Sequence, residues 1–159
     1  MRGSIFGINR DTRFSTDKTP YKTYLDLWFW QGDGPSRERP GHFLRLTAES
    51  LTLGAGMHAF SDHALERYRQ AVLEDDRGQG LEQAASQTRA EIGGRTYKRV
   101  PAGLPADHPR AEWLRHSGLF ASVDQPLAAE FYTPQFVRLC FEHYRRLAPL
   151  QHWLNDVLT

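Results

Sequence analysis

Residues 24–30 read Tyr-Leu-Asp-Leu-Trp-Phe-Trp and give the clearest strand signal in the chain. Side chains of a β-strand point alternately to opposite faces, so this run predicts a strand with one apolar face and one mixed face. The apolar face carries Leu25, Leu27 and Phe29, and the mixed face carries Tyr24, Asp26, Trp28 and Trp30. The chain is therefore expected to contain a β-sheet.

The same alternation returns in residues 42–47 and 51–55, which are joined by Ala48-Glu49-Ser50. This pattern predicts a hairpin whose apolar face is supplied by Leu44, Leu46, Leu51 and Leu53. A shorter strand is expected at residues 5–9, and residues 119–123 are a candidate for a further strand. Residues 31–41 contain Gly-Asp-Gly-Pro and Arg-Pro-Gly, which predict an exposed loop.

From about residue 61 the apolar residues recur with the spacing of an α-helix. Ser61 is expected to cap a first helix, and a second helix is predicted over residues 81–92, ended by Gly93-Gly94. Asp107 is expected to cap a short helix that begins near Pro109. Strands followed by helices predict an α+β fold, in which an antiparallel sheet from the N-terminal half is packed by helices from the C-terminal half.

The last predicted helix starts after Thr133-Pro134, where a capping residue precedes a proline at the first helical position. Pro149 should kink or restart this helix, because proline removes a backbone donor and clashes with the preceding turn. Cys140 falls on its apolar face and is interpreted as a buried structural thiol.

The composition describes one domain over residues 1–159, with 40% hydrophobic and 25% charged residues. A single cysteine excludes an internal disulfide framework and a cysteine-rich zinc site. A net charge of +1 excludes the overall basicity of a dedicated nucleic-acid binder. The start, Met1-Arg2-Gly3-Ser4, lacks the apolar region of a secretory signal, and no apolar run has membrane-spanning length, so we expect a cytoplasmic protein without a membrane partner.

Residues 9–23 are an unusual polar segment between two predicted strands. Arg10 and Arg13 are suited to a carboxylate or phosphate, Lys18 and Lys22 add positive charge, and aspartates are available to hold the arginines. One interpretation is a loop that recognises an anion. The other is a solvated loop that Arg–Asp pairs merely brace.

A second basic cluster, Tyr97-Lys98-Arg99, would form one positive pocket with the first if the two segments fold side by side. Such a pocket suits a phosphorylated or nucleotide-like ligand. The predicted ligand-binding residues are Arg10, Asp11, Arg13, Phe14, Asp17, Lys18, Tyr21, Lys22, Lys98 and Arg99. The leading hypothesis is a protein that binds a phosphorylated or carboxylated small molecule. A nucleic-acid or protein interaction module and a ligand-free structural domain are the alternatives, and the acidic residues within the loop argue against nucleic acid.

No residue is assigned a catalytic role, and whether the protein is an enzyme is left open. His42, His58 and His63 are candidate metal ligands, but their spacing matches no established ligand pattern, so no metal and no cofactor is predicted. Asp107 and His108 are adjacent and therefore unsuited to act as an acid–base pair.

The motif Arg10-Asp11-x-Arg13-Phe14-x-x-Asp17-Lys18-x-x-Tyr21 resembles the signature of an uncharacterised family, domain of unknown function 2461, which occurs in bacteria and in some fungi. Similar segments extend the resemblance over nearly the whole chain, among them Pro40-Gly41-His42-Phe43-Leu44 and Tyr97-Lys98-Arg99-Val100-Pro101. The family supplies no established reaction.

Two departures from the family pattern are visible. Gly7 stands where the family usually has an arginine, and the usual helical segment before the first strand is missing. We therefore expect a shortened or truncated member of the family. Loss of that segment would expose the face of Trp28 and Trp30, and an exposed aromatic patch favours self-association into a homo-oligomer.

Overall fold

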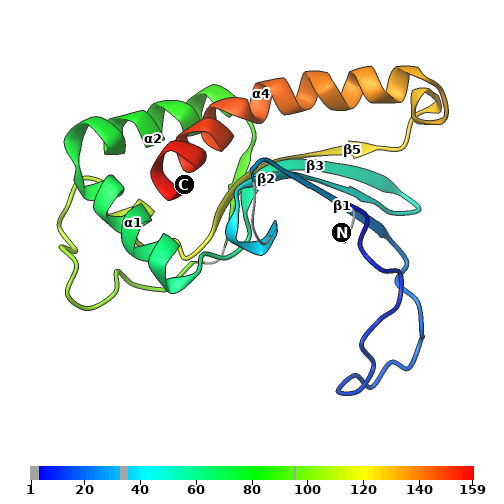
Figure 1. Ribbon diagram of the computed structural model, residues 1–159, viewed down its shortest axis with the longest axis horizontal. Coiled ribbons are helices and arrows are strands. Elements are labelled where there is room, and N and C mark those ends of the chain that lie inside the picture. The colour runs from blue at the N-terminus through cyan, green and yellow to red at the C-terminus, as the bar shows by residue number, and fades with distance from the viewer. Residues whose placement is uncertain (1–3, 33–35, 95) are drawn as a thin grey trace.

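The computed structural model describes residues 4–32, 36–94 and 96–159. One five-stranded sheet lies beneath a long helix, and further helices gather at one end of that sheet (Figure 1). The strands are β1 (Leu25–Trp30), β2 (Gly41–Leu46), β3 (Ser50–Met57), β4 (Glu91–Gly93) and β5 (Leu119–Pro126). The helices are α1 (Asp62–Leu73), α2 (Asp75–Thr88), α3 (Ala111–Leu114) and α4 (Gln135–Leu158), with 3-10 turns at Ser36–Glu38 and Ala129–Tyr132.

The sheet has the order β1-β2-β3-β5-β4, and each neighbouring pair is antiparallel. The predicted α+β class is confirmed, as are the strand predicted at residues 24–30, the hairpin and the strand that begins at residue 119. Two of the five strands, β4 and β5, follow helices α1 and α2 in the chain, so the C-terminal half also contributes to the sheet. Of the predicted loop 31–41, residues 33–35 lie outside the described residues.

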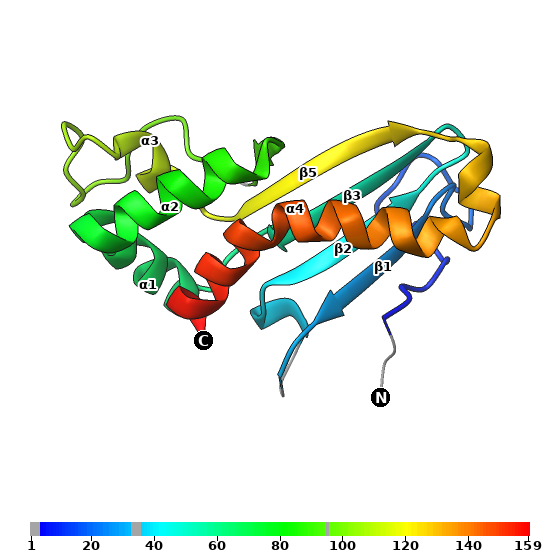
Figure 2. The ribbon, with the colours of Figure 1, turned by 90° about the horizontal axis from the view of Figure 1, so that it is seen from above.

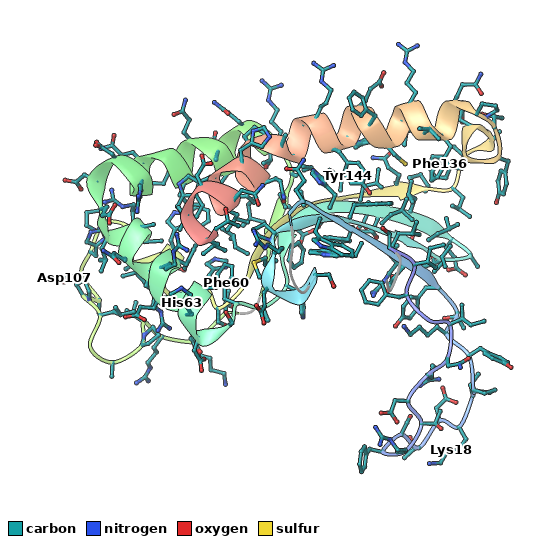
Figure 3. All side chains as sticks on the ribbon, in the orientation of Figure 1. Lys18, Phe60, His63, Asp107, Phe136 and Tyr144 are labelled. Atoms are coloured by element: carbon teal, nitrogen blue, oxygen red, sulfur yellow. The ribbon has the colours of Figure 1, made fainter. Side chains whose placement is uncertain are left out.

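Helix α4 covers one face of the sheet along its length (Figure 2). The predicted apolar face of the hairpin packs here, because Leu44, Leu51 and Leu53 form a buried cluster with Cys140 of α4. Tyr144 points from α4 toward the sheet (Figure 3), and its hydroxyl donates a hydrogen bond to the backbone carbonyl of Phe43 at 3.0 Å. This contact fixes α4 over the middle of β2.

The larger part of the core lies between the helices and the ends of β3 and β5. It contains Tyr68 and Val72 from α1, Leu81 from α2, and Leu150 and Leu154 from α4. Arg110 joins α1 to the segment before α3, since its Nε donates to the carbonyl of Val72 at 2.8 Å and its side chain is 7% exposed. Ser61 caps α1 as predicted, with its Oγ accepting from the backbone N–H of Ala64.

The second predicted helix was wrong in its limits. It spans Asp75–Thr88 rather than residues 81–92, because Arg89 adopts a left-handed conformation (φ 45°) that ends the helix. Ile92 fits the helical spacing but belongs to β4, where it pairs with Ala121 of β5. A partner distant in sequence thus overrides the local pattern.

One further helix-end prediction is wrong. Asp107 does not cap α3: Arg110 is the residue before that helix, and its backbone N–H donates to His108 Nδ1 at 3.1 Å. At Pro149 a kink or a restart was predicted, and α4 continues through this residue to Leu158 without a restart. Its axis changes direction toward the C-terminal end, as expected when a proline removes one hydrogen bond from the ladder (Figures 1 and 2).

Residues 4–23 form a projection that we call the arm. Its first residues add to the outer edge of β1, since the N–H of Phe6 donates to the Asp26 carbonyl at 3.0 Å and that of Trp28 donates to the Ser4 carbonyl at 2.8 Å. Farther out, residues 8–10 pair with residues 20–22 through an isolated bridge between Asn9 and Tyr21. The arm leaves the sheet on the side opposite α4 (Figure 1). The strand predicted at residues 5–9 is thus present only as isolated bridges.

Within the ranges that the structure describes, no helix combines the length and the apolar character that crossing a membrane requires.

Candidate functional site

The sheet face opposite α4, which we call the open face, holds a groove of about 600 Å³. Among the described residues, no helix lies over this face (Figure 1). All five strands contribute to its lining, and Phe6 of the arm forms part of one wall. Trp28, Phe43 and Phe120 supply the largest apolar side chains, and Asp26, Arg45 and Asp124 supply charge.

Three aromatic rings form the floor of the groove. Trp28 and Phe43 are register partners on β1 and β2, and their rings are nearly parallel, at 12° with centroids 6.5 Å apart. Phe120 meets Phe43 edge to face at a centroid distance of 5.6 Å, and His58 stacks against Phe120 at 6.2 Å. The floor is therefore continuous from β1 to β5.

Glycines allow these rings to lie flat on the backbone. The register places Phe43 opposite Gly54 and Phe120 opposite Gly93. A β carbon on Gly54 would lie 2.1 Å from Phe43 Cε1, and one on Gly93 would lie 2.7 Å from Phe120 Cζ. Any other residue would lift the rings and fill the groove from below. Phe43 is thus the ring that packs against Gly54.

The orientation of Trp28 is fixed by a hydrogen bond outside the sheet. Its indole Nε1 donates to the backbone carbonyl of Ser36 at 3.1 Å, in the 3-10 turn that precedes β2. A large ring held in one orientation offers stacking area with little loss of conformational entropy on binding.

The rim of the groove is acidic. Arg45 is held by its register partner Asp26 through two hydrogen bonds of 2.7 and 2.9 Å, and this pairing raises the pKa of Arg45. Asp124 accepts a hydrogen bond from the hydroxyl of Thr52, and Glu91 adds a third carboxylate. Three carboxylates against one guanidinium favour an uncharged or positively charged ligand over an anion.

The structure places the predicted basic residues of the arm in contact with carboxylates of the same segment. Arg13 donates two hydrogen bonds to Asp11, at 2.9 and 2.7 Å, and Arg10 is paired with Asp17. Hydrogen bonds from Thr19, and then the pairing with Arg10, hold the pKa of Asp17 well below its usual value. Both guanidinium groups therefore face internal partners, as the alternative of a braced loop requires.

The other residues of the arm that were predicted to bind a ligand lie on its surface. Lys18 Nζ donates to the Thr12 carbonyl at 2.9 Å, and Lys22 lies over the ring of Tyr24. Phe14 and Tyr21 are exposed.

Lys98 and Arg99 do not join the arm. They are exposed residues of the segment after β4, where Arg115 Nε donates to the carbonyl of Tyr97 at 2.8 Å. In both ribbon views this segment and the arm lie at opposite ends of the molecule (Figures 1 and 2). The single positive pocket that would combine the two basic clusters is therefore not formed.

The three histidines weighed as metal ligands are also separated. His42 faces α4, where its ring contacts Tyr144 at a centroid distance of 4.8 Å, whereas His58 lies on the open face and His63 on α1. Throughout the described chain, no group of three His, Cys, Asp or Glu side chains is placed to hold a metal ion. Cys140 is buried, and burial raises the pKa of its thiol.

A second hollow, of about 640 Å³, lies along the outer side of α1 and ends at Leu104. Most of its lining comes from charged and amide side chains of one helix, such as Glu66, Arg69 and Gln70. It has no aromatic lining residue, whereas the open face combines stacking rings with charge from several strands. The open face is therefore the better candidate site.

Sequence reasoning did not identify the open face as a site. Its residues come from strands that are far apart in the chain, and only the register brings them together. One signal was present: glycines at positions 41, 54 and 93 lie within short stretches that the sheet uses as strands, each beside an aromatic ring.

Residues 1–153 match a family model whose description is "Conserved hypothetical protein (DUF2461)". The chain belongs to this family, as the resemblance of its arginine–aspartate motif implied. No curated protein and no solved structure matches the chain. The family description assigns no activity, so the function has to be argued from the site.

Proposed function

We propose that this protein binds a flat, uncharged or positively charged ring compound in the groove of the open face. The observation that carries the proposal is the pair of nearly parallel rings, Trp28 and Phe43, held flat against the sheet beneath an acidic rim. Ring faces carry partial negative charge and attract both other rings and cations.

The dimensions of the groove support this function. Its volume of about 600 Å³ lies within the range of roughly 300–1,000 Å³ that is typical of small-molecule sites. The carboxylate of Asp124 and the exposed Glu91 stand at the rim, where they can accept hydrogen bonds from ring or amino donors of a ligand.

An anionic ligand on the arm, as the sequence predicted, has less support. A phosphate or carboxylate would have to displace Asp11 from Arg13 and Asp17 from Arg10. On the open face the same anion would meet an acidic rim. The acidic rim also disfavours the phosphate backbone of a nucleic acid.

Three probes that share a flat ring but differ in charge test the proposal by calorimetric titration. They are adenosine, which is uncharged, adenosine 5′-monophosphate, which is anionic, and proflavine, which is cationic. We expect adenosine and proflavine to bind more tightly than the monophosphate, and Trp28→Leu to weaken their binding by about tenfold or more. Tyr132→Leu, which alters an exposed ring outside the groove, is the matched control.

The anionic alternative gives the opposite pattern. It requires the monophosphate to bind most tightly and Arg10→Ala or Arg13→Ala to abolish that preference, while Trp28→Leu has no effect. Either this pattern or the absence of binding by adenosine and proflavine would overturn the proposal.

A further inference from the structure

The arm carries apolar side chains that are largely exposed to solvent. Phe14 at its tip is 95% exposed, and Ile5, Ile8 and Tyr21 are each more than half exposed. A two-stranded ribbon that stands alone in water is marginally stable at best, because it buries little apolar surface. These side chains are therefore available to pack against another surface.

The open face offers an apolar surface against which the exposed side chains of the arm can pack. Its floor of Trp28, Phe43 and Phe120 is apolar and only partly buried. The arm projects on this same side of the sheet, and its base contributes Phe6 to the groove (Figure 1).

The charges of the two surfaces are complementary. The arm has four cations, Arg10, Arg13, Lys18 and Lys22, against the two carboxylates of Asp11 and Asp17. The lining of the open face has three carboxylates against the single guanidinium of Arg45. A positive arm and a negative face attract each other and set the orientation of an encounter.

The arm does not lie on the open face of its own chain. Lys18 marks its outer end, which stands well away from the sheet (Figure 3). The complementary face that this end can reach therefore belongs to another molecule.

We infer that two copies of this chain form a two-fold dimer in which the arm of each copy lies on the open face of the other. Two-fold symmetry makes the two contacts equivalent, so each arm–face contact is formed twice. In this dimer the partner's arm closes the groove from above. The inference does not rest on the proposed ligand, because the association can be measured without one.

Reversing charges on each surface separately tests this arrangement. The arm variant is Arg13→Glu with Lys18→Glu, and the face variant is Glu91→Lys with Asp124→Lys. We expect the wild type to sediment at twice the chain mass of 18.3 kDa. Each variant alone should be monomeric, because its arm and its face carry the same sign of charge. An equimolar mixture should regain the dimer mass, because each arm then meets a face of opposite sign.

Circular dichroism checks that both variants keep the native fold. A third variant, Phe14→Ser, alters a ring that is exposed on its own chain and should raise the dimer dissociation constant by about tenfold or more. Tyr132→Ser, at an exposed ring outside the arm, should leave it unchanged. A wild type that stays monomeric at about 0.1 mM, a dimer that survives either charge reversal alone, or a mixture that stays monomeric would overturn the inference.

Discussion

The ring of Phe43 occupies the space that a side chain on Gly54 would need. The two residues are directly opposite on β2 and β3, and a β carbon on Gly54 would lie 2.1 Å from Phe43 Cε1. The backbone carbonyl of Phe43 meanwhile accepts the hydroxyl of Tyr144 from the other side of the sheet. One residue thus links the packing of α4 to the flat floor of the open face.

Gly54→Ala should lower the free energy of unfolding by about 1–3 kcal/mol, because the Phe43 ring has to leave its position. In a Phe43→Ala background the same substitution should cost less than about 0.5 kcal/mol, since the ring is gone. Urea denaturation of the four proteins in this cycle measures both values. Equal costs in the two backgrounds would show that the ring is not what requires glycine.

Arg110 should contribute strongly to stability although its ion pair is weak. Its buried guanidinium donates to the carbonyls of Val72 and Glu74 at the end of α1, whereas its carboxylate partner Asp75 is 89% exposed. Arg110→Met leaves these carbonyls without their donor and should cost about 2–4 kcal/mol. Asp75→Asn should cost less than about 0.5 kcal/mol. Comparable losses for the two variants, measured by urea denaturation, would contradict this assignment.

Stability should fall as the solution is acidified below neutrality. Burial, together with nearby His152, lowers the pKa of His42 below its usual value of 6.5, and burial lowers the pKa of His116 likewise. The unfolded chain therefore binds these protons at a higher pH than the folded chain does. The stabilisation that comes from keeping His42 and His116 neutral is complete above about pH 6.5. It is lost as the pH falls below that value.

Thermal unfolding between about pH 8 and pH 5 tests this dependence. His42→Gln removes one titrating ring and should flatten the dependence of the melting temperature on pH. His63→Gln, on the exposed side of α1, should leave this dependence as in the wild type. A His42→Gln curve parallel to that of the wild type would assign the acid sensitivity to other groups.

Local pattern was sufficient for β1, β2, β3 and the start of β5, and for the face that α4 covers. Leu44, Leu51 and Leu53 fall on one face of their strands at a spacing of two, and each lies in the buried cluster that this spacing predicts. The start of α1 was also predicted, because an N-cap such as Ser61 acts within its own turn.

Helix α2 and strand β4 were mispredicted because distant partners determine them. The first turns of α2 have few apolar residues, and Gly78 gives space to Arg110, from which a β carbon there would be 2.2 Å away. Ile92 continues a helical spacing, yet it pairs with Ala121.

The candidate site shows the same division between local and distant contacts. Arg13 and Asp11 are two residues apart, so a braced arm was foreseeable from the sequence. The separation of Lys98 and Arg99 from the arm depends on the path of the whole chain. The open face requires the register of several strands before Trp28, Phe43 and Phe120 become neighbours.

Amide chemical shifts of the ¹⁵N-labelled protein during titration with adenosine test most directly where the chain binds a ring. We expect the largest changes at the open face, at the backbone amides of Gly54 and Gly93 and at the indole N–H of Trp28. Changes confined to residues 10–22 of the arm, with the signals of the open face unmoved, would contradict it.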